Sequence, residues 1–185
     1  MIKIPEKEGR LSAAKAAHIE AVIAFVKRKT EGYRRNLFAN ISRVMLVSGT
    51  FEDMSARDDW SWLSDFILAD VKTLKQMIGR PELLQFDEFK RMYSDYFSAG
   101  SDKYVDASTK YNAYTFIENL GVTICPYCDE EYLDVVENGN GGKLRTLEID
   151  HFFPKGKYPA LAMCFYNLVP SAELQWNEAR GALGN

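Results

Sequence analysis

The sequence lacks any apolar run close to the roughly 20 residues that a helix needs to cross a bilayer. Its N-terminal stretch is charged and has no apolar core of the kind found in signal peptides. Only three of the 185 residues are cysteines, an odd number that argues against the disulfide framework of a small secreted protein. We therefore expect a cytoplasmic protein that makes no membrane contact.

A strong excess of charge of one sign is also missing, because the net charge is only −3. With 46% hydrophobic and 26% charged residues, the composition is that of an ordinary globular protein. The charge is nevertheless uneven. Residues 1–50 hold ten Lys/Arg and four Asp/Glu, residues 51–106 hold seven and twelve, and residues 107–185 hold six and ten. A nucleic-acid binder can be acidic overall when its basic residues share one surface, so the net charge does not exclude that class.

The first two thirds of the chain predict helices, because apolar residues recur there at spacings of three and four. Ser12 and Asp106 are the expected N-caps of the first and last of these helices. We expect helices over 11–47 with a break or bend at Gly32, over 57–79, from Pro81 to about Phe97, and over 106–120.

At Gly121 the pattern changes to that of strands and turns. Residues 132–137 and 144–149 are compatible with strands, and a glycine-rich stretch between them is a strong turn signal. The expected elements are a knuckle and a hairpin over 122–149, an irregular loop over 150–170, and a final helix over 172–179 that Ser171 caps. The fold class that follows is α+β.

The end of the last predicted strand brings a carboxylate and an imidazole together, at Asp150 and His151. Hydrolysis of a phosphodiester needs a water nucleophile, a base and positive charge for the leaving oxygen. Asp150 could hold a divalent ion, and the imidazole of His151 titrates near neutral pH, which suits a general base. Asn167 could then orient His151 through a hydrogen bond, and Lys155 and Lys157 could bind phosphates. Each of these residues alone is more often structural, so the prediction depends on their order and spacing.

Three runs of this segment together carry a family resemblance. Cys125-Pro-Tyr-Cys128, Asp150-His-Phe-Phe-Pro-Lys-Gly-Lys-Tyr-Pro159 and Tyr166-Asn-Leu-Val-Pro170 resemble HNH endonucleases, the ββα-metal family, over roughly residues 114–182. The resemblance implies a DNA endonuclease that uses Mg²⁺ or Mn²⁺, with Asp150 and Asn177 as metal ligands. It also implies His151 as the general base and Asn167 as its support.

The resemblance divides the chain into a helical N-terminal region, residues 1–113, and an HNH nuclease module, residues 114–185. Nucleases of this type occur beside an ATPase in bacterial anti-phage systems such as the Septu type, which implies an ATPase partner. The helical region would dock that partner or DNA, or would support self-association as a homo-oligomer. Its basic residues between 27 and 43 form either a DNA-binding face or an ordinary solvated helix face.

The chain departs from the family at the second cysteine pair, where it has Ala172 and Gln175. A structural Zn²⁺ site normally needs four ligands, and Cys125 and Cys128 supply two. Cys164 is either a third ligand or a buried apolar cysteine.

The metal-binding asparagine is also displaced, because Asn177 comes one residue later than the family spacing. Glu173 and Glu178 are the alternative ligands on the same predicted helix. Relatives of this kind often continue beyond this point, so the resemblance leaves room for a further C-terminal segment.

Two other functions stay open at this stage. Cys125-Pro-Tyr-Cys128 is also the active-site pattern of glutaredoxins, which exchange thiols and disulfides. That alternative leaves the run from Asp150 to Pro159 unexplained, and a long helical stretch precedes the motif where a thioredoxin-like fold would begin with a strand. The second alternative is a degenerate HNH module that binds its target without cutting it.

Overall fold

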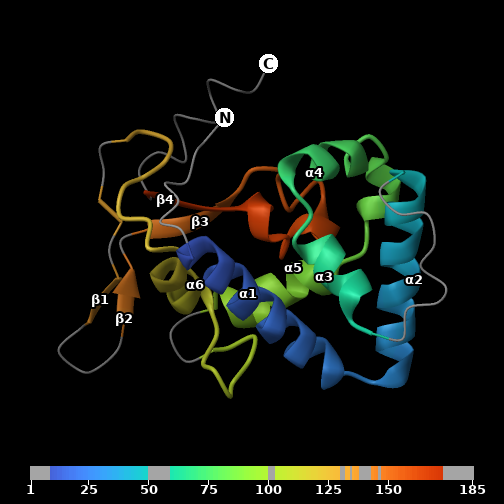
Figure 1. Ribbon diagram of the computed structural model, residues 1–185, viewed down its shortest axis with the longest axis horizontal. Helices are drawn as coiled ribbons and strands as arrows, with labels where there is room; N and C mark the ends of the chain where they lie inside the picture. The colour runs from blue at the N-terminus through green and yellow to red at the C-terminus, as the bar shows by residue number, and fades with distance from the viewer. Residues whose placement is uncertain are drawn as a thin grey trace.

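The computed structural model has an α+β fold, in which helices surround one side of two small antiparallel sheets (Figure 1). It describes residues 9–49, 59–99, 103–129, 132–133, 135–137, 143–145 and 147–172. Within those ranges, no helix combines the length and the apolar character that a membrane span requires.

The first two helices are α1 (Arg10–Lys27) and α2 (Glu31–Val47), which confirms the predicted helical stretch. The break lies before Gly32, because the side chain of Thr30 accepts a hydrogen bond from the backbone N–H of Tyr33 and caps α2. The prediction of Ser12 as an N-cap is wrong. Helix α1 already begins after Gly9, so Ser12 lies inside its first turn.

The predicted helix over 57–79 is two helices, α3 (Ser61–Ile67) and α4 (Val71–Met77). Asp70 separates them, because its carboxylate accepts a hydrogen bond from the N–H of Thr73 at 2.7 Å and starts a new helix. The next predicted helix is also divided. It consists of the 3₁₀-helix η1 (Pro81–Leu84), then α5 (Glu88–Met92), which continues into a π-helix, η2 (Tyr93–Phe97).

Helix α6 (Ala113–Leu120) is shorter than predicted and has a different cap. The side chain of Asn112 accepts hydrogen bonds from the N–H groups of Tyr114 and Thr115. Asp106, the predicted cap, instead closes a tight turn by accepting hydrogen bonds from Ser108 and Thr109. The expectation therefore confused two residues that both suit an N-cap position.

In the part of the chain that the structure describes, the strands form two separate pairs. Strand β1 (Val135–Glu137) pairs with β2 (Lys143–Arg145), which confirms the predicted hairpin in part. The predicted strand over 144–149 is wrong as one element, because β3 (Leu147–His151) pairs with β4 (Leu168–Ala172) and not with β1.

Strand β4 also corrects two other predictions. The stretch 150–170 is not an irregular loop throughout, since it contains the end of β3, the 3₁₀-helices η3 (Pro159–Leu161) and η4 (Phe165–Asn167), and the start of β4. Ser171 is paired with Glu148 inside β4, so it is not a helix cap. The rest of the predicted final helix lies outside the described residues.

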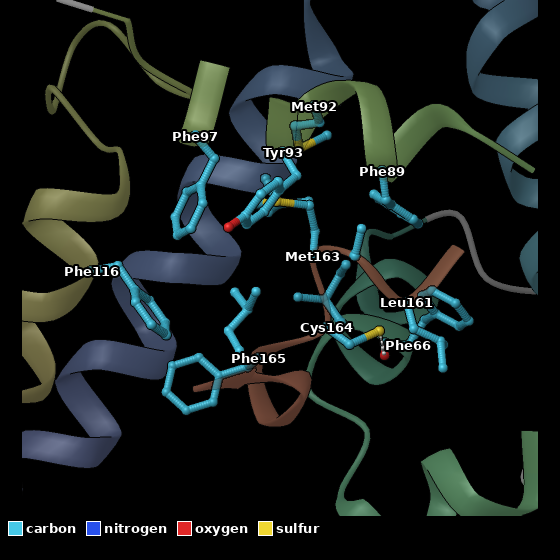
Figure 2. Packing of buried hydrophobic residues seen from close by; sticks show 14 of the residues in the cluster. Phe66, Phe89, Met92, Tyr93, Phe97, Phe116, Leu161, Met163, Cys164 and Phe165 are labelled. Carbon is cyan, nitrogen blue, oxygen red and sulfur yellow. Dashed lines mark hydrogen bonds between the residues drawn. The ribbon is translucent and has the colours of Figure 1, made fainter. Parts of the chain in front are cut away.

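The segment between β3 and β4 enters the middle of the helices, among α3, α4 and α5 in Figure 1. Helix α5 packs on η3, and the residues that follow η3 are buried. Figure 2 shows this packing, where side chains of the segment meet aromatic side chains of the N-terminal helices; the labelled residues are Phe66, Phe89, Met92, Tyr93, Phe97, Phe116, Leu161, Met163, Cys164 and Phe165. One buried cluster therefore includes residues on both sides of position 113.

Candidate functional site

Asp150 and His151 occupy the last two positions of β3. Successive residues of a strand point to opposite faces of the sheet. The burial of β3 follows this alternation at most positions, since Ile149 and His151 are buried, Asp150 is half-buried and Glu148 is exposed. Asp150 and His151 therefore leave the strand on different sides and contact different parts of the molecule.

The imidazole of His151 is held in one tautomer. Its Nε2 lies 3.1 Å from the carbonyl oxygen of Ala162. A carbonyl only accepts, so Nε2 carries the hydrogen and Nδ1 of the neutral ring keeps its lone pair. The ring of Tyr93, the first residue of the π-helix, meets His151 edge-on at a centroid distance of 4.5 Å.

Burial and, to a smaller extent, the nearby charge of Lys155 lower the pKa of His151 to about 4, against the opposing effect of the hydrogen bond to Ala162. The ring is therefore neutral at physiological pH, and its Nδ1 can accept a proton. Lys155 is half-buried, and its Nζ lies 4.2 Å from the centroid of the Tyr93 ring. Lys157 is exposed, with its Nζ 5.3 Å from the centroid of the Tyr158 ring.

Asp150 is bound by a residue that the sequence did not single out. The phenol O–H of Tyr127, inside the Cys-x-x-Cys turn, donates a hydrogen bond of 2.9 Å to Oδ2 of Asp150. Burial raises the pKa of Tyr127, as do the charge of Asp150 and the hydrogen bond itself, so the phenol stays protonated and remains a donor. Within the described residues, Oδ1 of Asp150 has no hydrogen-bond partner.

Asn167 is fully buried and works on the backbone around His151. Its Oδ1 accepts a hydrogen bond of 2.6 Å from the N–H of Phe153, and its Nδ2 donates to the carbonyl oxygens of Phe153 and Leu161. Phe153 follows His151 by two positions, and Leu161 precedes Ala162, whose carbonyl holds the imidazole. Asn167 therefore fixes both sides of the His151 environment, and its contacts are with these backbone groups rather than with His151 itself.

Cys125 and Cys128 form a turn that is tied to the sheet. The N–H of Asp129 bonds to the carbonyl oxygen of Cys125, and the backbone N–H of Ala172 in β4 lies 3.5 Å from the Cys125 sulfur. Burial raises the pKa of the Cys125 thiol, but hydrogen bonds from Ala172, Cys128 and Tyr127 outweigh it and bring the pKa below its ordinary value. The turn does not begin a helix in the described residues, unlike the active-site turn of a glutaredoxin.

Cys164 lies apart from this turn. It is fully buried, and its thiol points to the carbonyl oxygen of Phe66 at 3.5 Å, drawn as a dashed line in Figure 2. Burial raises the pKa of the Cys164 thiol. Cys164 was expected to be either a third metal ligand or a buried apolar cysteine, and its surroundings match the second interpretation.

A metal site is only partly represented in the described part of the chain, which contains no group of three or more His, Cys, Asp or Glu side chains placed to hold an ion. Mg²⁺ usually keeps several waters and binds through one or two carboxylates, so a half-buried carboxylate with one oxygen available fits such an ion. The other expected ligand, Asn177, and its alternatives Glu173 and Glu178 lie outside the described residues. For Zn²⁺, the described turn supplies two thiols, Cys125 and Cys128.

Several basic residues of the stretch 27–43 have intramolecular partners. Arg28 donates to the carboxylate of Asp106 at 3.1 Å, and Arg34 pairs with Glu31 at 2.7 Å. The ammonium of Lys29 lies 4.0 Å from the centroid of the Phe25 ring, at a cavity of about 520 Å³ that neither Asp150 nor His151 lines. These contacts favour a structural use for this part of the basic stretch.

Sequence reasoning missed three contacts of the site. Tyr127 could have been predicted from the sequence, because it lies inside the Cys-x-x-Cys motif. Tyr93 and Ala162 had no such signal, since their proximity to His151 depends on tertiary packing. Comparison of the chain with family models, curated proteins and solved structures found no match.

Proposed function

We propose that this protein is a metal-dependent HNH-type endonuclease that hydrolyses DNA phosphodiester bonds at the end of β3. The observation that carries the proposal is the state of His151, which is neutral, held through Nε2 and left with a lone pair on Nδ1. An uncharged imidazole with a lone pair available is what a general base for water activation requires. The family resemblance of the surrounding sequence supports the same reaction.

The order of elements supports the proposal as well. An antiparallel pair, β3 and β4, encloses the segment that contains Asn167, and a helix is predicted after β4. The resemblance implies two strands and then a helix; β3 and β4 supply two strands, and the helix predicted over 172–179 lies, apart from Ala172, outside the described residues. Because Asp150 and His151 leave β3 on opposite faces, the proposal requires the scissile phosphate to lie at the strand end, which both side chains border.

In the proposed reaction, Nδ1 of His151 takes a proton from a water molecule, which attacks the phosphorus. Lys155 would bind a phosphate oxygen nearby and would favour the neutral state of the imidazole. Asp150, with Asn177, would hold Mg²⁺ or Mn²⁺, which supplies the positive charge that the leaving oxygen needs. Asn167 keeps Ala162 and the backbone after His151 in position. Lys157 would contact the DNA backbone farther from the reacting atoms.

The wider setting of the proposal rests on the resemblance alone. It comprises action in the cytoplasm, in anti-phage defence, beside an ATPase partner. The helical region, residues 1–113, would provide the docking surface for that partner, and residues 114–185 would form the HNH module with its Cys-x-x-Cys knuckle and, if further ligands are supplied, a structural Zn²⁺.

The test is nicking of supercoiled plasmid with Mg²⁺ or Mn²⁺, by the wild type and by His151→Gln. Glutamine can still donate a hydrogen bond to the carbonyl of Ala162 but cannot act as a base. We expect His151→Gln to lose about 100-fold or more of the rate. Because His151 is buried against the ring of Tyr93, the variant also loses some stability, so nicking is measured at a temperature at which both proteins are folded. The matched control is Tyr132→Phe, at an exposed position, which should cut normally.

Two outcomes would refute the proposal. Cutting by His151→Gln at the wild-type rate would exclude the imidazole as the base. Cutting that survives EDTA would exclude the metal. DNA binding without cutting, unchanged by EDTA, would instead indicate a degenerate HNH module that only binds.

A further inference from the structure

Tyr127 makes a contact that no part of the proposed reaction yet uses. Its phenol donates a hydrogen bond of 2.9 Å to Oδ2 of Asp150, across 23 positions of the sequence. An ionised carboxylate only accepts, so the direction of this bond is fixed. Hydrogen bonds to a charged acceptor are roughly twice as strong as neutral ones, so the contact restrains the Asp150 side chain.

The turn that carries Tyr127 is itself anchored to the sheet. The sulfur of Cys125 accepts a hydrogen bond from the N–H of Ala172 at the end of β4. Ile124 and Tyr132, on either side of the turn, form an antiparallel bridge. The turn is thus attached to β4 through Cys125 and to β3 through Tyr127. These contacts hold the backbone of Tyr127 in place.

We propose that Tyr127 is a positioning residue for Asp150, which sets how this carboxylate binds a divalent ion. The proposal rests on the proposed function. The phenol occupies one lone pair of Oδ2, so it competes with an ion that would take both oxygens and leaves Oδ1 as the less engaged oxygen. Mg²⁺ and Mn²⁺ accept a single carboxylate oxygen, whereas Ca²⁺ often takes both oxygens of one carboxylate. Tyr127 therefore favours the smaller ions at this site.

The variant that tests this is Tyr127→Phe, which removes one oxygen atom and keeps the ring. Partners of metal ligands typically contribute 10- to 100-fold to metal affinity, so we expect Mn²⁺ to bind about 10-fold more weakly. Ca²⁺ affinity should fall less, because both oxygens of Asp150 become available. A loss of folded protein would lower the amount of bound metal without changing this ratio.

The experiment measures Mn²⁺ binding by electron paramagnetic resonance, with Ca²⁺ as a competitor, and plasmid nicking across a range of Mn²⁺ concentrations. The proteins are the wild type, Tyr127→Phe, Asp150→Asn and the matched control Tyr132→Phe, which removes a hydroxyl from an exposed tyrosine at the same turn. We expect Tyr127→Phe to need about 10-fold more Mn²⁺ and to recover near wild-type nicking at saturation.

The outcomes separate this inference from the proposed function. If Asp150→Asn loses metal and nicking while Tyr127→Phe matches the wild type, the role of Tyr127 is refuted and the nuclease stands. If Tyr132→Phe changes as much as Tyr127→Phe, the effect is a general one of the turn and the inference also fails. A wild type that neither binds Mn²⁺ nor nicks DNA refutes both proposals.

Discussion

His18 offers the sharpest test of the packing, because the structure buries it completely as a neutral ring. Its Nε2 donates to the carbonyl oxygen of Met163 at 2.8 Å, and its Nδ1 accepts from the phenol of Tyr111 at 3.0 Å. The rings of Phe97, Phe116 and Phe165 also surround it, so a second proton would place a charge among apolar rings. His18 thereby joins α1 to the segment between β3 and β4.

Burial lowers the pKa of His18 from 6.5 to about 4, against the opposing effect of the hydrogen bond to Met163. The unfolded chain therefore binds a proton near pH 6.5, whereas the folded chain does not until about pH 4. The stability is fully present above pH 6.5 and is lost as the pH falls toward 4. At about 1.4 kcal/mol for each pH unit, the loss reaches roughly 3 kcal/mol.

The variant that isolates this effect is His18→Gln, whose amide can donate to Met163 and accept from Tyr111 but does not titrate. We expect it to be less stable at pH 7 by about 2–4 kcal/mol, because the ring leaves a cavity. Between pH 7 and 4.5, however, the wild type should lose roughly 2.5 kcal/mol more than the variant. Urea unfolding at a series of pH values measures both free energies, and His151 titrates in both proteins.

The result that would refute this reasoning is a pair of parallel curves. If wild type and His18→Gln lose the same free energy from pH 7 to 4.5, His18 is not buried as a neutral ring in solution. A constant difference of 2–4 kcal/mol would then report only the lost packing.

Three further predictions concern stability and metal content. Asn167→Ala should lower the free energy of unfolding by about 3 kcal/mol, since it leaves the N–H and the carbonyl oxygen of Phe153 unpaired, whereas Leu161 keeps its bond from Cys164. Urea unfolding measures this, and a loss under 1 kcal/mol would contradict it. The hydrogen bond from the Ser108 hydroxyl lowers the pKa of Asp106 to about 2. Burial opposes this shift, and further hydrogen bonds add to it. Stability from this group is therefore lost as the pH falls from about 4 toward 2, and acid titration of Asp106→Asn should lack that step. Cys164→Ala should leave any bound zinc unchanged in elemental analysis, whereas Cys125→Ala should remove it; zinc lost from both would make Cys164 a ligand.

The helices were predictable because their signals are local. Apolar spacing located the helical stretches, and the three N-caps whose side chains accept a hydrogen bond, Thr30, Asp70 and Asn112, are residue types that favour this position. The errors at Ser12 and Asp106 have the same origin. Several residues of the right type compete for each cap, and only the turn geometry decides between them.

Strand β4 was missed for a physical reason. Pro170 lies in its middle, and proline is rare in strands because it cannot donate a ladder hydrogen bond. Here the sheet has two strands, so Pro170 opposite Ile149 needs to satisfy one neighbour only. All five residues of β4 are buried, which removes the alternation that marks a half-exposed strand.

The residues of the candidate site were predictable by type, but their surroundings were not, because the N-terminal helices supply them. Tyr93 packs its ring on His151 and donates its O–H to the carbonyl oxygen of Ile149, in the same strand. His18 holds Met163, the residue after the Ala162 carbonyl that fixes His151. The N-terminal helices therefore contribute to the burial that lowers the pKa of His151. They also hold the residue next to the carbonyl that fixes its tautomer. A change in this core would alter the basicity of His151. It would leave Asp150 in place, because the hydrogen bond from Tyr127 holds that carboxylate on the other face of β3.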